Sequence, residues 1–273
     1  MSRSILMRHS QTLLFGLGIF FISFFLISCS ASRQKKAYSN YSLGNHAFEN
    51  GDLIQALNYF QHAQQFNPKD PDVEHMIGLT HLARGDFDAK GEYLQRAENH
   101  LLSAIKKYPD FEPLPNEEYG RLTLSEARVN LSAIYLQMGK WDESIEYARK
   151  AMEDPLYRFP DRANYNLGIA YFQKGQPYKA INHLKMAVDI NRNFPGGYKT
   201  LGEIYLDLKR YPEALESFHK AIEAYNKYTE AYYLIGITYQ RQNRRADARK
   251  FFRKCYSIDP EGPFSRRCKD FLE

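Results

Sequence analysis

NLGIAY at residues 166–171 returns as TLGEIY at 200–205 and as LIGITY at 234–239, in steps of 34 residues. Each copy places an apolar residue directly before a glycine and a tyrosine three residues after it. The pair of an apolar and a small residue also occurs earlier in the chain, as Leu43-Gly44, Ile77-Gly78 and Leu131-Ser132. A period this regular indicates a structural unit repeated six times.

Further small residues follow each pair at fixed distances. They lie twelve and nineteen residues after the small residue of the pair, at Ala56, Ala63, Ser144, Ala151, Ala180, Ala187, Ala214, Ala221, Ala248 and Cys255. Two antiparallel helices approach closely only where side chains are small, and large apolar residues fill the remaining space. Such fillers are present at Phe60, Leu101, Leu184, Phe218 and Phe252. Glycines lie where the first helix of a pair is expected to stop, at Gly51, Gly85, Gly139 and Gly175.

This pattern resembles the tetratricopeptide repeat (TPR), a helix–turn–helix unit of 34 residues. The resemblance implies an all-α solenoid of six repeats over residues 37–262, in which each repeat buries the apolar face of the next. A solenoid also needs a closing helix with one polar face, and residues 263–273 are predicted to be this C-terminal capping helix. Phe264, Cys268 and Phe271 recur there at helical spacing.

Two segments interrupt the period. Ala97 comes late in the second repeat, which implies an insertion of about seven residues near residues 86–93. Residues 112–124 carry Pro113 and Pro115 and are predicted to form a spacer or ordered loop. Each segment is open to two interpretations, a specific contact surface or a surface loop that the fold tolerates.

Residues 1–28 are predicted to be a lipoprotein signal peptide. Arg3 and Arg8 precede an apolar run that is short for a membrane-spanning helix. The run ends in Leu-Ile-Ser-Cys at residues 26–29, which has the form of a lipobox. This motif predicts cleavage before Cys29, a covalent lipid on its thiol and a lipidated tether over residues 29–36. The alternative is an uncleaved signal anchor with an incidental cysteine.

Ser30 follows the expected lipidated cysteine, which is compatible with an outer-membrane position and a TPR domain that faces the periplasm. Removal of residues 1–28 takes away two arginines and no acidic residue, so the net charge falls from +5 to +3. Charges of both signs are interspersed, unlike the concentrated basic surface of a nucleic-acid-binding protein. No nucleic-acid partner is therefore expected.

Motifs that carry catalytic chemistry were not found in the sequence. There is no HExxH pair, no cysteine or carboxylate cluster with metal-ligand spacing, no phosphate-binding glycine loop and no GxSxG motif. We therefore predict no enzyme activity, no catalytic or metal-binding residue, no cofactor apart from the covalent lipid and no small-molecule substrate. His62, His75 and His81 are predicted to be helix-surface residues.

A disulfide is predicted between Cys255 and Cys268. Cys255 falls on the packing face of the last repeat, where the capping helix that carries Cys268 is expected to dock. An exported protein permits disulfide formation. The alternative is a pair of buried free thiols.

TPR stacks bind partners along the concave face made by successive first helices. Residues one turn before and after each apolar–small pair are predicted to line this groove: Tyr38, Tyr41, Asn45, Phe48, His75, Leu79, Leu82, Val129, Ala133, Leu136, Tyr165, Ile169, Phe172, Lys199, Glu203, Leu206, Tyr233, Ile237 and Arg241. The set is more apolar and aromatic than a solvated face, which favours an amphipathic helix or an apolar peptide as the partner. Any one of these residues has packing between repeats as its alternative role.

One stretch is more specific than a generic repeat. DPLY at residues 154–157, followed by Pro160, Ala163 and NLG at 166–168, resembles a stretch of the type IV pilus pilotins, the PilF, PilW and Tgl group. The ending CKDFLE at residues 268–273 is similar to the Tgl branch. Pilotins are outer-membrane lipoproteins that help secretin subunits reach the outer membrane and assemble into a ring. The resemblance implies this role and a secretin subunit as the partner.

Two other functions remain open for a TPR lipoprotein. A scaffold of outer-membrane protein assembly, of the BamD type, has the same anchor and fold. A regulator of peptidoglycan enzymes binds a synthase or a hydrolase. The first predicts general envelope defects and the second altered cell-wall turnover, whereas a pilotin predicts loss of secretin multimers.

Overall fold

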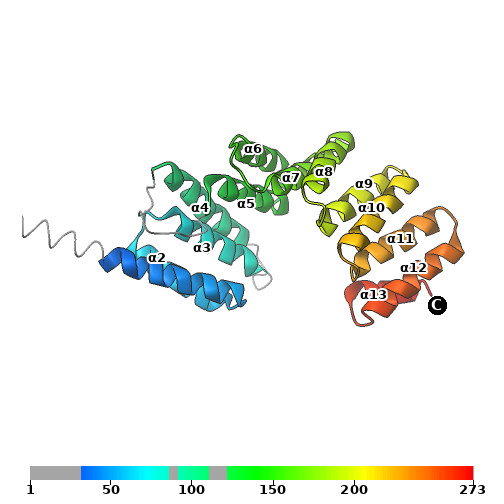
Figure 1. Cartoon of the computed structure of the whole chain (residues 1–273), viewed down its shortest axis with the longest axis horizontal. Coiled ribbons are helices and arrows are strands. Elements are labelled where there is room, and N and C mark those ends of the chain that lie inside the picture. Colours follow the sequence, from blue (N-terminus) through cyan, green and yellow to red (C-terminus); the bar gives the residue numbers. More distant parts are fainter. Residues whose placement is uncertain (1–31, 86–91, 111–121, 273) are drawn as a thin grey trace, which may run out of the picture. The chain divides into compact units, whose positions relative to one another are not determined.

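The computed structural model describes residues 32–85, 92–110 and 122–272, and all regular elements in these ranges are helical. The chain divides into two compact units, Met1–Thr123 and Leu124–Glu273. The N-terminal unit contains a helix over residues 32–49, α2 (Leu53–Phe66), α3 (Pro71–Ala83), α4 (Glu92–Lys107) and the 3-10 helix η2 (Tyr108–Asp110). The C-terminal unit contains α5 (Leu124–Gln137), α6 (Trp141–Met152), α7 (Pro160–Gln173), α8 (Pro177–Ile190), α9 (Pro195–Asp207), α10 (Tyr211–Ala224), α11 (Thr229–Arg241), α12 (Arg245–Ile258) and α13 (Pro263–Asp270) (Figure 1).

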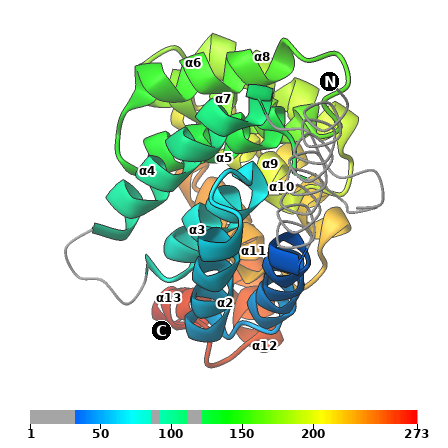
Figure 2. The same cartoon turned by 90° about the vertical axis from the view of Figure 1, so that its left-hand side faces the viewer.

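Successive helices pack as pairs within each unit. In the C-terminal unit the pairs are α5 with α6, α7 with α8, α9 with α10 and α11 with α12. In the N-terminal unit α3 packs on α4, and α2 lies beside α3 (Figure 2). The predicted all-α TPR architecture is therefore confirmed.

The small residues of the period lie where paired helices touch. A Cβ atom added to Gly168 would lie 2.5 Å from Cγ of Leu184, and one added to Gly202 would lie 2.5 Å from the ring of Phe218. Gly78 faces the backbone oxygen of Ala97, at 3.2 Å from such a Cβ. The late alanine of the second repeat thus occupies the expected close approach, despite the shift in sequence.

In most of the pairs, one residue of the turn after the first helix has a left-handed backbone. Gly139 and Gly175 have φ angles of 73° and 71°, as their places in the sequence predict. In the last two repeats the same conformation is adopted by Lys209 and Asn243, with φ angles of 59° and 60°. A glycine search alone therefore missed two of these turns.

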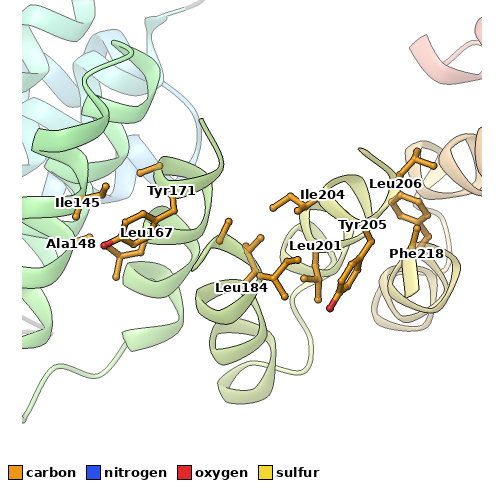
Figure 3. Close-up of a cluster of buried hydrophobic side chains, with 14 of the residues drawn as sticks. Ile145, Ala148, Leu167, Tyr171, Leu184, Leu201, Ile204, Tyr205, Leu206 and Phe218 are labelled. Atoms are coloured by element: carbon orange, nitrogen blue, oxygen red, sulfur yellow. The ribbon is translucent and has the colours of Figure 1, made fainter. Parts of the chain in front are cut away.

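The largest apolar core lies in the C-terminal unit. It runs from Ile145 through Leu167, Leu184 and Ile204 to Phe218, so each repeat contributes to it (Figure 3). Two alanines of the period, Ala180 and Ala214, belong to this core and are fully buried. This continuity means that the stability of each repeat depends on its neighbours.

The N-terminal unit buries polar side chains along α3. His75 has no exposed surface and His81 is 9% exposed, so the prediction that both lie on a helix surface is wrong. His62 is exposed, as predicted. The reason is that α3 packs between α2 and α4, so residues on both of its sides are covered.

The capping helix closes the last repeat. α13 packs against α11 and α12, and Cys255 and Cys268, the pair predicted from the sequence, form a disulfide. The ring of Phe271 stacks on that of Phe252 with centroids 4.6 Å apart. Tyr233 contacts both rings, which joins α11 to the cap.

Removal of this disulfide by Cys255→Ser with Cys268→Ser is expected to lower the free energy of unfolding by up to about 3 kcal/mol, because the bond closes a short loop in the unfolded chain. Thermal denaturation followed by circular dichroism measures the effect. Dithiothreitol added to the unaltered chain serves as the matched control, since it should produce the same loss. An unchanged melting temperature in both cases would contradict the prediction.

Several predictions fall on residues outside the described ranges. These are the signal peptide, Cys29, most of the insertion near residues 86–93 and most of the spacer at 112–124. Residues 32–36 of the predicted tether belong to the helix over residues 32–49. Among the described helices, none has both the length and the apolar character needed to cross a membrane.

Candidate partner-binding surface

The predicted groove residues lie on the first helices of the pairs. Most are partly exposed: Tyr38, Tyr41, Asn45, Phe48, Leu79, Leu82, Ala133, Leu136, Tyr165, Ile169, Phe172, Lys199, Glu203, Tyr233, Ile237 and Arg241. Three are buried and cannot contact a partner. His75 is fully covered, and Val129 and Leu206 are each 4% exposed. The prediction fails at these three because a one-turn step also reaches the face that packs on the neighbouring repeat.

In the N-terminal unit the predicted residues have packing roles as well. Tyr41, Phe48 and Leu79 lie against the core formed around Phe60, and the rings of Tyr41 and Phe60 are 5.8 Å apart. Oδ1 of Asn45 is buried and accepts no hydrogen bond from the described residues. A donor from a bound segment can satisfy this oxygen, which makes Asn45 the groove residue of this unit with the clearest unmet bonding capacity.

In the C-terminal unit the first part of the surface is apolar. Leu136 of α5 and Tyr165 and Phe172 of α7 are half-buried and pack on the edge of the main core. Ile169, between them on α7, is partly exposed and lies outside that core. Of these residues Ile169 is the most available for contact with a partner.

The next part of the surface is ionic. Lys199 and Glu203 were predicted as groove residues, but their ion pairs were not. Lys199 on α9 lies 3.5 Å from Oε2 of Glu203 and 3.4 Å from Oε1 of Glu230 on α11. The side chains of these three residues are 21 to 36% exposed. The surface formed by α9 and the start of α11 is therefore charged, with a lysine that joins two carboxylates across neighbouring repeats.

Burial and charge shift the ionisation of this cluster. Burial raises the pKa of Glu203, and the nearby Lys199 opposes that rise. Burial by itself would lower the pKa of Lys199, but Glu203 and Glu230 outweigh it and raise that pKa. Lys199 therefore stays charged at neutral pH, and it lies between the side chains of Glu203 and Glu230.

Aromatic and hydroxyl groups flank the ionic cluster. The rings of Tyr165 and Phe194 are 4.8 Å apart, and Oη of Tyr165 lies 3.5 Å from Oγ1 of Thr200. Burial, followed by the nearby Glu230, raises the pKa of Tyr228. The sequence analysis missed Thr200, Tyr228 and Glu230. The helical spacing could have identified Glu230, because it lies one helical turn before the predicted groove residue Tyr233.

Tyr233 itself belongs more to the cap than to a groove. Its ring centroid lies 5.8 Å from that of Phe264 and 6.1 Å from that of Phe252. Arg241, near the end of the same helix, is exposed and donates a hydrogen bond to the backbone oxygen of Leu206 at 3.4 Å. The candidate surface of the C-terminal unit is thus centred on α7, α9 and the start of α11.

The DPLY stretch forms the connection between α6 and α7. Asp154 accepts hydrogen bonds from the hydroxyl of Ser125 and from the backbone N–H of Leu156, both at 2.9 Å. Leu156 is 85% exposed, whereas Tyr157 is half-buried. The aspartate therefore holds the turn in place.

Among the described residues, no group of three His, Cys, Asp or Glu side chains is arranged to hold a metal ion.

Comparison with known proteins agrees with the repeat assignment. Family models described as tetratricopeptide repeat match residues 124–154, 161–227 and 197–261. The type IV pilus assembly protein PilF of Pseudomonas aeruginosa is 23% identical over 156 residues. The match covers 52% of this chain and 62% of PilF, so it spans less than two thirds of that relative.

Solved structures share the fold. That of Pseudomonas aeruginosa PilF gives a TM-score of 0.67 at 14% identity, over 88% of this chain and 99% of PilF. PilW, a type IV pilus biogenesis factor, gives 0.68 at 19% identity, over 85% of this chain and 97% of PilW. The Cut9–Hcn1 assembly of the APC/C gives 0.68 at 17% identity, over 87% of this chain and 43% of the matched chain. Because a protein of a different assembly matches equally well, these superpositions show the fold and not the partner.

Proposed function

The chain is a tetratricopeptide-repeat protein, and from this premise we propose that it acts in type IV pilus assembly by binding another protein along the first helices of its repeats. The observation that carries the proposal is the sequence match to PilF, whose name states a role in type IV pilus assembly. The fold alone is not sufficient support, since TPR stacks serve many partners.

The candidate surface supports binding rather than catalysis. Ile169 offers an apolar contact on α7, and the Lys199, Glu203 and Glu230 cluster offers charge-assisted hydrogen bonds on α9 and α11. A peptide segment or helix that combines apolar and charged side chains suits this arrangement. We propose a segment of a secretin subunit as this partner.

The proposed place of action is the periplasmic side of the outer membrane. The lipobox that ends at Cys29 supports it, because two or more acyl chains on one residue make a stable anchor. In this role the chain holds secretin subunits at the membrane and promotes their assembly into multimers.

Cells that lack the protein are expected to lose detergent-resistant secretin multimers while secretin monomer persists. Ile169→Glu and Glu203→Lys should each reduce the multimers at least about fivefold, since a contact residue at the centre of an interface costs about 1–2 kcal/mol when it is disrupted. Cys29→Ala should release the chain from the membrane fraction and give the same loss. Immunoblots of cell fractions measure secretin and this protein together.

Tyr178→Ala is the matched control, because Tyr178 lies on the second helix α8 and is 69% exposed. It should leave multimers unchanged at equal protein levels. Normal multimers in the deletion strain would overturn the proposal. If general outer-membrane proteins are depleted in that strain, a scaffold of the BamD type takes its place. If cell-wall turnover changes instead, a regulator of peptidoglycan enzymes does.

A further inference from the structure

The C-terminal part of the chain carries a concentration of positive charge that the whole-chain balance hides. Residues 241–273 contain ten lysines and arginines and five acidic residues, a net charge of +5. Since the chain after residue 28 has a net charge of +3, residues 29–240 have a net charge of −2. The description of charges as evenly interspersed is therefore wrong for α12 and α13, which pack together at the end of the C-terminal unit (Figure 1).

α12 differs from the other second helices in how its charges are arranged. α4, α6 and α10 each contain an ion pair at a spacing of four residues: Arg96 with Glu92, Lys150 with Glu146 and Lys220 with Glu216. α12 has five basic residues and a single acid, Asp247, which pairs with Arg244 just before the helix.

The exposed basic residues of α12 repeat at the same spacing without acidic neighbours. Arg249 is four residues before Arg253, and Lys250 is four residues before Lys254. All four side chains are exposed, and none forms an ion pair with a described residue. Like charges at this spacing disfavour a helix. Their presence at positions where α4, α6 and α10 use mixed pairs points to a negatively charged partner.

A hollow of about 620 Å³ lies on this face of α12. Its lining residues are Ala246, Lys250, Phe251, Arg253, Lys254 and Ser257. The ring of Phe251 is held from two sides, with Tyr239 stacked at 5.5 Å and His219 edge-on at 5.8 Å. The hollow thus combines a fixed aromatic ring with three cations.

We propose that this hollow binds an acidic segment of a protein, with an apolar side chain against Phe251 and carboxylates on Lys250, Arg253 and Lys254. The three cations favour a partner with acidic side chains, because opposite charges complement each other across an interface. The ring of Phe251 favours an apolar side chain between those acidic residues. A membrane surface needs only the charges and leaves the hollow without a role. This surface is on a second helix, so it is separate from the site on the first helices and goes beyond the proposed pilus function.

The proposal is tested with the full chain carrying Cys29→Ser, which removes the expected lipid. The probe is a fluorescent twelve-residue peptide built from Glu-Glu-Leu triplets, and binding is followed by fluorescence anisotropy. Reversal of three charges, Lys250→Glu with Arg253→Glu and Lys254→Glu, is expected to raise the Kd at least about tenfold. Peptides with Gln for Glu or Gly for Leu should each bind more weakly, since each lacks one of the two recognised features.

The matched control reverses the same number of charges elsewhere, with Lys185→Glu, Arg192→Glu and Lys227→Glu. These three residues are exposed and lie outside α12 and α13. The control should change the Kd less than about twofold at 0.15 M salt, where distant charges are screened. Circular dichroism verifies that both triple variants are folded.

Equal weakening by both triple variants would overturn the proposal, because it would show an effect of net charge alone. The second arm uses vesicles of phosphatidylethanolamine and phosphatidylglycerol in a 3:1 ratio. If the vesicles, and not the peptide, bind in a way that depends on Lys250, Arg253 and Lys254, the surface faces a membrane and the proposal is wrong. Neither outcome depends on secretin. A negative result here therefore leaves the proposed pilus function untouched, and a negative result for the pilus function leaves this proposal untouched.

Discussion

A change of pH from 7 to 5 is expected to destabilise the N-terminal unit by about 2–4 kcal/mol, with His75 and His81 of α3 as the cause. Burial lowers the pKa of His75 to about 3. Burial, together with the charges of His100, Arg96 and Arg84, lowers the pKa of His81 to about 4. Both side chains are therefore neutral in the folded unit.

The geometry explains why His75 stays neutral. The hydroxyl of Tyr108 donates a hydrogen bond to Oδ1 of Asp72 at 2.9 Å, so the Nδ1–H of His75, at 3.1 Å, donates to the hydroxyl oxygen of Tyr108. A second proton would place a positive charge on a ring that has no exposed surface, which burial disfavours. The folded unit thus resists protonation, whereas the unfolded chain takes up the proton near the ordinary pKa of about 6.5.

The sign of the effect follows from the direction of the shifts. A histidine whose pKa is lowered by folding stabilises the fold above its unfolded pKa, and this stability is lost as the pH falls below about 6.5. At pH 5 His75 has lost about 2 kcal/mol of stabilisation, and His81, which solvent screens in part, has lost at most the same amount.

Glu74 responds in a lower pH range. Burial by itself would raise its pKa, but hydrogen bonds from His100, Lys107 and Gln64 outweigh burial and lower the pKa to about 2. The stability from Glu74 is present above its unfolded pKa and is lost only as the pH falls from about 4.5 toward 2. It therefore adds little to the change between pH 7 and 5.

Urea denaturation at pH 7 and at pH 5 measures the effect with two probes. Far-UV circular dichroism reports all helices, whereas the fluorescence of Trp141, the single tryptophan, reports the C-terminal unit. In that unit burial lowers the pKa of a single histidine, His183, so its own loss is expected to be smaller. At pH 5 the dichroism curve should therefore shift to lower urea than the fluorescence curve.

Two variants separate the histidines from other effects of acid. His75→Gln with His81→Gln should remove most of the difference between pH 7 and 5, at the expense of some stability at pH 7. His62→Gln changes an exposed histidine on α2 and should leave the pH dependence as it is. Coincident curves for the unaltered chain at both pH values would contradict the prediction.

Phe218→Ala is expected to lower the free energy of unfolding by about 3–5 kcal/mol, because a fully buried phenylalanine leaves a cavity when it is truncated. Phe218 fills the space beside Gly202, and the main core joins it to Leu201, Tyr205 and Leu206 (Figure 3). Chemical denaturation at neutral pH measures the loss. Since each repeat is stabilised by its neighbours, the last two repeats should unfold before the rest of this unit.

Tyr178→Ala is the control for the Phe218 variant. It removes an aromatic ring of similar size that is 69% exposed on α8, and it should change the free energy of unfolding by less than about 0.5 kcal/mol. Phe218→Leu should have an intermediate effect, because leucine fills part of the space. Equal losses for Phe218→Ala and Tyr178→Ala would show that the ring does not support the core as described.

The amino-acid sequence by itself determined the repeat, the helix pairs, the close approaches and the partners of the disulfide. The repeat, the helix pairs and the close approaches depend on residue size at fixed positions, as at Gly168, Gly202 and Ala97. The disulfide partners follow from the place of Cys255 on the packing face against which the capping helix docks. A glycine or alanine is small in any environment, so its spacing along the chain is sufficient to place it. The residues of the period could therefore be assigned before any contact was known.

Only the tertiary structure decided which side chains on the first helices are available to a partner. His75, Val129 and Leu206 share the spacing of the groove residues, but a neighbouring helix covers each of them. The ion pair between Lys199 and Glu230 joins residues of two repeats. The physical reason is that burial and charge pairing depend on contacts between helices. The spacing of residues along one helix does not specify which other helix packs against them.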